Sequence, residues 1–326
     1  MWIVTEGPFE FITVIIKQSL DMISMNGIRI TCDVKLVTDD WKIEGASGKE
    51  SLLGVVTEFV AGKWSDSQIE EFVKRNLPTA CLSAQELEDV LALGQEELLE
   101  AAAKELRIVS GKGAASELAE ICLYGVLREH FNCFPMASKI FYKQNSHDPA
   151  KGADSVHVRK ETDGTLTYWY GEAKFFTNFG SVEIDQVVSS VEELFMPEKM
   201  KKENRLIVNY RDLEKNLDDE TLYRKAKEML RGGLTDGFMK VLHVPIMVIF
   251  QGKPQSEGAD ESAFFEEIKN LQLEKAKKYF PKHIERLNKV LGGDYISVCF
   301  HLILFPIKEK KLLASWFNTQ MSILAK

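Results

Sequence analysis

The sequence lacks the signatures of several common classes of functional site. None of its five cysteines lies in a CxxC or another zinc-binding spacing, and its six histidines form no HExxH or paired-ligand motif. Gly111-Lys112-Gly113 lacks the G-x-x-x-x-G-K-[ST] spacing of a phosphate-binding loop. We therefore expect no zinc site and no ATP hydrolysis by this chain, and we expect the cysteines to be buried free thiols in a reducing compartment.

Long apolar runs are also absent. The segment Ile12–Ile16 is too short to cross a bilayer and is flanked by Glu10 and Lys17. The first residues carry no cationic secretory start. These features predict a cytoplasmic protein that does not enter the membrane.

Acidic residues outnumber basic ones, so the formal net charge is −8. This is unusual for a nucleic-acid enzyme, since affinity for nucleic acid comes mostly from neutralising phosphates. Basic residues nevertheless gather locally, at Lys139, Lys143 and Lys151 and again at Lys199, Lys201, Lys202 and Arg205. Such runs are often only solvated faces, but they also suit an enzyme that binds DNA weakly alone and needs a partner to hold it.

The composition is that of a globular chain, with 45% hydrophobic and 28% charged residues in 326 positions, enough for one large or two modest domains. Residues 1–105 are predicted to form an α+β region without a catalytic constellation, which we interpret as regulatory or partner-binding. Its expected elements are strands near Phe11–Ile16 and Ile28–Val37 and helices at Ser65–Arg75, Ser83–Leu93 and Gln95–Leu106.

Residues 106–326 are predicted to form a second unit around a central sheet. Continuous apolar runs such as Ile246–Phe250 and Val298–Phe305 are typical of strands covered on both faces. After a helix near 113–130 and a set of three strands, the expected elements are helix Ser181–Phe195, strand Arg205–Tyr210, helix Asp219–Arg231, strand Val244–Gln251, helix Glu261–Leu291, strand Tyr295–Phe305 and helix Lys311–Leu324.

What the chain does contain is Glu172-Ala173-Lys174 on a β-rich segment. Residues two apart on a strand share a face, so this carboxylate and this cation point the same way. If Gly164 is left-handed in a turn on Thr162-Asp163-Gly164, Glu161 pairs with Thr165, and Asp154 then lies opposite Glu172. Two opposed carboxylates at roughly 5 Å can share a divalent ion. A two-residue turn would put Asp154 on the other face, and an isolated E-x-K is often only a surface salt bridge.

The upstream helix carries two more carboxylates. Glu117 and Glu120 are adjacent at i, i+3 on the narrow polar side of a largely apolar helix. Either one reaches the metal, or both only favour the positive end of the helix dipole and face water.

The order of these motifs resembles that of the restriction-endonuclease-like PD-(D/E)xK nuclease superfamily, in which a helix Glu is followed by an Asp at a strand start and then by E-x-K on the next strand. Gly152-Ala153-Asp154 stands where that superfamily shows Pro-Asp, and the interval from Gly113 to Glu117 is similar to the helix opening of Holliday-junction-resolvase-like members. The resemblance implies an α/β fold with a mixed central sheet flanked by helices. Gln186 is similar to a trailing Gln motif of some members, although a solvated helix glutamine explains it equally well.

A closer resemblance runs over about residues 105 to 320. Ser116-Glu117-Leu118-Ala119-Glu120, the two motifs above and the strand His243–Val248 look like the HamA family, the nuclease subunits of the Hachiman anti-phage system. This resemblance implies a DNA nuclease held in check by a HamB-like helicase partner.

Together these features predict phosphodiester hydrolysis assisted by Mg²⁺, with Mn²⁺ as an alternative ion, because all expected ligands are oxygens. Asp154, Glu172 and Glu117 would hold the ion, with Glu120 as an additional candidate ligand, and Lys174 would orient water and stabilise charge. We expect Glu117 to matter more than Glu120 because of its spacing from Gly113. Lys139, Lys143 and Lys151 would bind DNA. Two alternatives stay open: a catalytically silent DNA-binding or assembly subunit, whose carboxylates would fail to converge, and a nuclease that acts on RNA.

Overall fold

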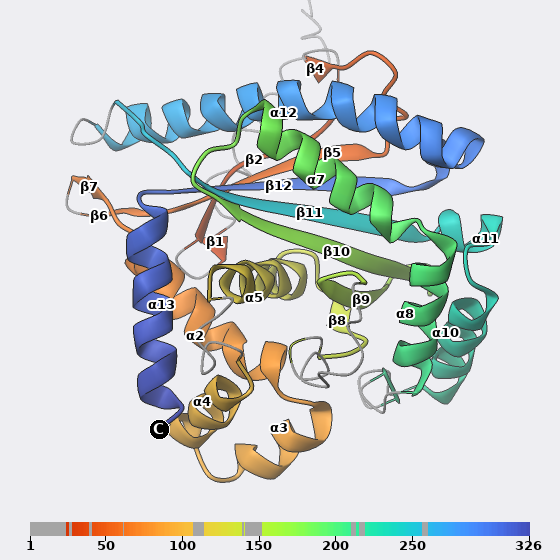
Figure 1. The fold of residues 1–326 in the computed structure, drawn as a ribbon, viewed down its shortest axis with the longest axis horizontal. Coiled ribbons are helices and arrows are strands. Elements are labelled where there is room, and N and C mark those ends of the chain that lie inside the picture. Colours follow the sequence, from red (N-terminus) through yellow and green to blue (C-terminus); the bar gives the residue numbers. More distant parts are fainter. Residues whose placement is uncertain are drawn as a thin grey trace, which may run out of the picture.

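The computed structural model describes residues 24–25, 28–38, 41–60, 62–106, 114–138, 140, 152–209, 213–214, 219–255 and 260–326. The strand expected at Phe11–Ile16 lies outside these residues. Within them the fold is a mixed α/β arrangement around one eight-stranded sheet (Figure 1). The strands, in spatial order, are β1 (Ser24–Met25), β2 (Ile28–Lys35), β5 (Glu50–Thr57), β12 (Cys299–Ile307), β11 (Leu242–Gln251), β10 (Leu166–Phe176), β9 (Ser155–Lys160) and β8 (Phe134–Pro135).

The centre of the sheet is parallel and its two sides are antiparallel. Strands β5, β12, β11 and β10 pair in parallel, whereas β2 runs antiparallel to β5 and β9 runs antiparallel to β10. Nearly every residue of β11 is buried, as expected for a parallel strand with helices on both faces. Two small hairpins pair β3 (Val37–Thr38) with β4 (Trp41–Lys42) and β6 (Phe59–Val60) with β7 (Lys63–Trp64).

Two separate groups of helices cover the two faces of the sheet (Figure 1). One face packs against α7 (Ser181–Leu194), α8 (Pro197–Asn209), α10 (Glu220–Gly232), α11 (Asp236–Met239) and α12 (Glu261–Leu291). The other packs against α2 (Ser67–Cys81), α4 (Gln95–Lys104), α5 (Ala114–Glu129) and α13 (Lys310–Leu324). Helix α3 (Ala84–Leu91) has no fully buried residue and begins at Ser83 with the capping box that Ser83 and Glu86 predict.

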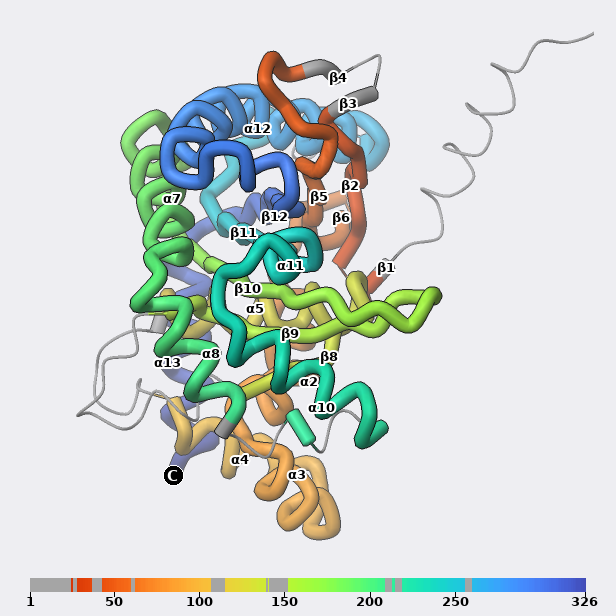
Figure 2. The backbone as a smooth tube through the Cα atoms, turned by 90° about the vertical axis from the view of Figure 1, so that its right-hand side faces the viewer, coloured from red at the N-terminus to blue at the C-terminus, as the bar shows by residue number. Residues whose placement is uncertain are grey.

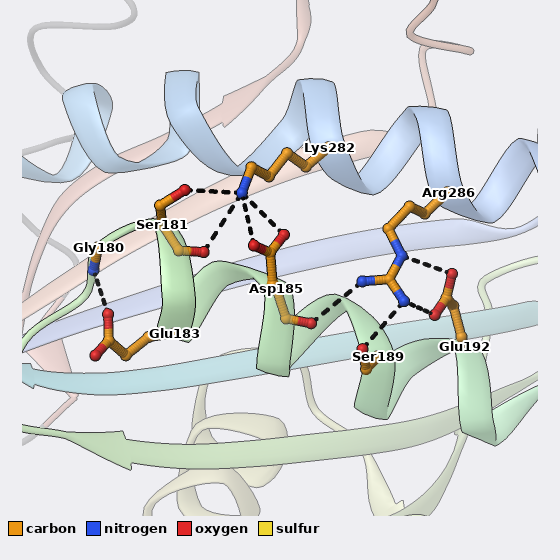
Figure 3. A network of polar contacts seen from close by, with 8 residues as sticks. All are labelled: Gly180, Ser181, Glu183, Asp185, Ser189, Glu192, Lys282 and Arg286. Carbon is orange, nitrogen blue, oxygen red and sulfur yellow. Dashed lines mark hydrogen bonds and ion pairs between the residues drawn. The ribbon is translucent and has the colours of Figure 1, made fainter.

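Polar contacts fix α7 against α12 (Figure 3). Lys282 Nζ donates to Asp185 Oδ1 at 2.8 Å, and the Arg286 guanidinium contacts Glu192 through two nitrogens and donates to Ser189 Oγ at 3.0 Å. A bidentate Arg–carboxylate pair holds a defined geometry better than a single contact does. Because α7 follows β10 directly in the chain, this network positions the end of the strand that carries Glu172 and Lys174.

The sheet crosses the expected boundary at residue 105. Strands β1, β2 and β5 precede residue 60 yet join the same sheet as β10, β11 and β12. The division into a partner-binding region 1–105 and a nuclease region 106–326 stays a prediction about function.

One predicted element is wrong. Residues 205–209, expected as a strand, belong to helix α8. The buried positions Met200, Glu203, Asn204, Ile207 and Val208 recur at helical spacing, so the short apolar run is the inward face of an amphipathic helix. Pro197 at the first helical position also favours this helix start.

The helices α7, α10, α12 and α13 are confirmed within one residue at each end, whereas α2 continues six residues beyond its expected end at Arg75, to Cys81. The strand expected from Tyr295 begins later, at Cys299, because Gly292–Ser297 forms a 3₁₀ helix. All five cysteines are free, and all but Cys299 are buried.

Candidate active site

The β9–β10 hairpin has the register that places Asp154 opposite Glu172. Gly164 has φ of +81°, and the Glu161 amide donates to Thr165 O at 2.8 Å. The pairs run from Leu166 with Lys160 to Gly171 with Ser155, and the Asp154 amide donates to Gly171 O at 2.8 Å. The odd-length turn predicted from the sequence is thus confirmed. Figure 2 shows this hairpin reaching out to one side of the molecule.

The two carboxylates lie where β9 stops pairing with β10. The Asp154 Oδ2 atom accepts a hydrogen bond from the Ala173 amide at 3.1 Å. The Asp154 side chain thus bonds to the β10 backbone just beyond the last backbone pair between the two strands. Glu172 is 6% exposed. Burial of a charged group is costly unless it is paired or binds a cation, which makes this strand end a candidate for ion binding.

Lys174 provides the nearest positive charge. Its ammonium group forms an ion pair with the Glu172 carboxylate, and its side chain is 28% exposed. Burial alone would lower the pKa of Lys174, but the charge and hydrogen bond of Glu172, with further contributions from Asp154 and Glu120, raise this pKa above its ordinary value. Lys174 is therefore protonated at neutral pH and can donate hydrogen bonds, but it cannot act as a general base.

Both helix carboxylates are buried, at 5% exposure for Glu117 and 7% for Glu120. Glu120 shares with Asp154 the lining of a cavity of about 10 Å³, roughly the room for one water or one small ion. Glu120 also raises the pKa of Lys174, to which Glu117 does not contribute, while burial first and then the charges of Glu117 and, less strongly, Glu120 raise the pKa of the Cys81 thiol. The geometry therefore favours Glu120 over Glu117 as the helix carboxylate of this site.

The chemistry of the donors fits a hard divalent cation. Asp154, Glu172 and Glu120 offer only oxygens, which suits Mg²⁺ or Mn²⁺ and not zinc. Among the residues that the structure describes, no three acidic, His or Cys side chains are arranged closely enough to enclose a metal ion. Mg²⁺ commonly binds through one or two carboxylates together with waters and substrate phosphates, so the opposed pair Asp154 and Glu172 is the part of this set that fits it.

Helix α8 supplies residues that sequence reasoning missed. The Glu203 carboxylate, 3% exposed, lies so close to Gly152 that a Cβ there would be 1.8 Å from Oε2. The Tyr170 hydroxyl donates to Asn204 Oδ1 at 2.6 Å. Gly152, directly before Ala153-Asp154, indicates in the sequence that another group approaches the backbone closely there. Because the sequence predicts residues 205–210 as a strand, Glu203 is not recognised from it as that group.

The other candidate residues lie away from this cluster or outside the described chain. Gln186 is exposed on α7, as expected for a solvated glutamine. His157 is on the opposite face, as predicted, packed against Tyr124 with ring centroids 4.9 Å apart, and burial lowers its pKa to about 3. Lys139, Lys143 and Lys151 lie outside the described residues.

The family model described as HamA matches residues 32–321 of the chain. That span includes the described strands β3 to β12, part of β2 and every residue of the cluster above. No curated protein matches the chain. None of the helices described here combines the length and the apolar character that a bilayer crossing requires.

Proposed function

Because the chain belongs to the HamA family of the Hachiman anti-phage defence, we propose that it is a metal-dependent nuclease that cleaves DNA phosphodiesters. The observation that carries this proposal is the hairpin register, which continues from Gly171 opposite Ser155 to set Glu172 opposite Asp154, together with the ion pair of Lys174 with Glu172. The order α5, β9, β10, α7 supports a PD-(D/E)xK core, as the motifs predict.

The roles follow from the positions of the side chains. Asp154 and Glu172 would hold Mg²⁺, and Glu120, which lines a cavity together with Asp154, would act through a bound water. When bound, the ion would supply a Lewis acid that polarises the scissile phosphate and lowers the pKa of a coordinated water. Glu172 is held in place by Lys174, and Asp154 by the Ala173 amide.

Lys174 would act as a fixed cation at the point where negative charge develops. Its raised pKa keeps the proton on the amine, so it donates to the attacking water or to a phosphate oxygen and stabilises the transition state. Removing one such donor from an active site commonly costs on the order of a hundredfold to a thousandfold in rate.

This proposal accounts for the geometry better than a silent assembly subunit does. A subunit without catalysis would not need two opposed carboxylates, one of them buried, beside a single lysine at a strand end. The choice between DNA and RNA rests on membership of a family that acts in anti-phage defence.

The direct test is cleavage of labelled DNA by the purified chain. Glu172→Ala and Lys174→Ala should each abolish cleavage and leave the folded state intact. The matched control is Glu274 with Lys278, an exposed glutamate–lysine pair on α12 in which both side chains are 59% exposed. Glu274→Ala and Lys278→Ala should cleave like the parent chain. Parental activity in either site variant would overturn the assignment.

A helicase partner is the second part of the proposal. A DNase without base readout would damage the chromosome of its host, so restraint has to come from another protein. We expect a stable complex with a HamB-like helicase, made largely through residues 1–105. Co-elution of the co-expressed pair in size-exclusion chromatography supports this; elution of the chain alone beside a folded helicase contradicts it.

A further inference from the structure

A basic groove lies between α8 and α10, which Figures 1 and 2 both draw side by side. The groove has a volume of about 500 Å³. Four cations, Lys201, Lys202, Arg205 and Arg231, line it against one acid, Glu198. A chain with a net charge of −8 thus has a local surface of the opposite sign.

Three of the four cations of this groove are exposed side chains without an ion pair to a described residue. Within the described residues, Lys201, Arg205 and Arg231 form no ion pair, and all three side chains are exposed. Lys201 and Arg205 are one turn apart on α8, about 6 Å along the helix axis. Cations spaced along a helix face suit a ligand with repeated negative charges, and the DNA backbone is such a ligand.

The floor of the groove is joined to the candidate active site by hydrogen bonds. Asn204 lines the groove, donates through Nδ2 to Leu230 O at 3.0 Å, and accepts from the Tyr170 hydroxyl at 2.6 Å. Tyr170 is two residues before Glu172 on the same face of β10. The next residue of α8, Glu203, lies against Gly152, directly before Ala153-Asp154.

We propose that this groove binds the sugar–phosphate backbone of the DNA that is cleaved at Asp154, Glu172 and Lys174. This inference rests on the proposed nuclease function and adds the surface that holds its substrate. The groove contacts phosphates, so it gives affinity without sequence preference.

The test measures binding separately from cleavage. All proteins carry Glu172→Gln, so that DNA is not cut, and binding of a short fluorescent DNA duplex is followed by anisotropy at several salt concentrations. Arg205→Gln and Arg231→Gln are each compared with Lys278→Gln, which removes the same charge from an exposed position on α12 that does not line the groove. Circular dichroism and the unfolding midpoint show whether each variant is folded.

Each lost phosphate contact should reduce the slope of log Kobs against log salt by about 0.9. Raising the salt from about 50 to about 200 mM weakens DNA binding by the parent. The same change should weaken binding by the double variant Arg205→Gln/Arg231→Gln by a factor about twelve times smaller. Lys278→Gln should leave the slope unchanged. An unchanged slope in the folded groove variants, an equal loss in the control, or tighter binding of polyglutamate than of DNA would overturn the proposal.

A cleavage arm separates this inference from the nuclease proposal. With Glu172 restored, the groove variants should raise KM for DNA and retain kcat at saturation, because the groove holds DNA away from the reacting atoms. Cleavage with unchanged KM in both variants refutes the groove and leaves the nuclease standing. Groove-dependent binding without cleavage in the parent chain supports the groove and refutes the nuclease.

Discussion

Lys174 forms an ion pair with Glu172 in the site, and this gives an asymmetric stability prediction. The carboxylates of Glu172, Asp154 and Glu120 all act on its pKa. When all are ionised, these three carboxylates and Lys174 together carry two net negative charges. Lys174→Met increases the net negative charge of these groups to three. Glu172→Gln decreases it to one, and Lys174 keeps the carboxylates of Asp154 and Glu120.

The magnitude follows from the burial of the pair. Two unit charges about 5 Å apart interact by roughly 3 kcal/mol at an effective dielectric constant near 20. Breaking a buried pair from one side costs about 3 to 5 kcal/mol, and the 28% exposure of Lys174 places it at the lower end. We expect Lys174→Met to lower the free energy of unfolding by about 2 to 4 kcal/mol and Glu172→Gln by less than about 1 kcal/mol.

The assay is urea unfolding at neutral pH in EDTA, followed by circular dichroism, with Lys278→Met as the control for loss of an exposed lysine. The raised pKa of Lys174 means that its contribution is complete below the unfolded-state pKa and is lost only as the pH rises through the folded value, so neutral pH measures all of it. Added Mg²⁺ should restore more stability to Lys174→Met than it adds to the parent. A larger loss in Glu172→Gln than in Lys174→Met would refute the reasoning.

Three further predictions concern the helix, the metal and pH. Glu120→Gln should reduce cleavage more than Glu117→Gln, since Glu120 lines a cavity together with Asp154; equal and full activity in both would show that α5 contributes only packing. Cleavage should require Mg²⁺ or Mn²⁺, stop in EDTA and stay absent with Ca²⁺, which coordinates loosely; robust cleavage in excess chelator would exclude the metal mechanism. Burial lowers the pKa of His157 and His283 to about 3. Below about pH 6.5 the unfolded chain therefore binds more protons than the folded chain. The free energy of unfolding should fall by up to about 1.4 kcal/mol for each histidine and each pH unit of acidification. Urea unfolding between about pH 7 and about pH 5 tests this, and a flat profile would contradict the burial of neutral imidazoles.

The local geometry of the strand pair was predictable because turn chemistry determines register. Gly164 can adopt positive φ, and the turn it closes sets which residue faces Glu172. The long helix α12 was predictable for a similar reason, because its Asp260 cap and its apolar spacing over 31 residues leave little ambiguity.

Long-range pairing was not predictable from the same patterns. The strand β5 was not foreseen at all, and nothing local in Glu50–Thr57 indicates that it pairs with β12 some 250 positions later. The short apolar run Leu206-Ile207-Val208 is compatible with either a helix or a strand. Its tertiary packing favours the helix that the structure shows. The same packing brings Glu120, rather than Glu117, towards Asp154, because the rotation of α5 over the sheet is set by contacts such as Leu123 against Gly171.

The central claim is that Asp154 and Glu172 hold one divalent ion beside Lys174. The most direct measurement is the anomalous scattering of crystals grown with Mn²⁺ and a short DNA duplex. The account predicts one manganese peak bonded to a carboxylate oxygen of Asp154 and one of Glu172, with a phosphate oxygen on its open side and the Lys174 ammonium within hydrogen-bond distance of that phosphate. A chain that cleaves DNA in solution but whose manganese lies at other residues in the crystal would contradict it.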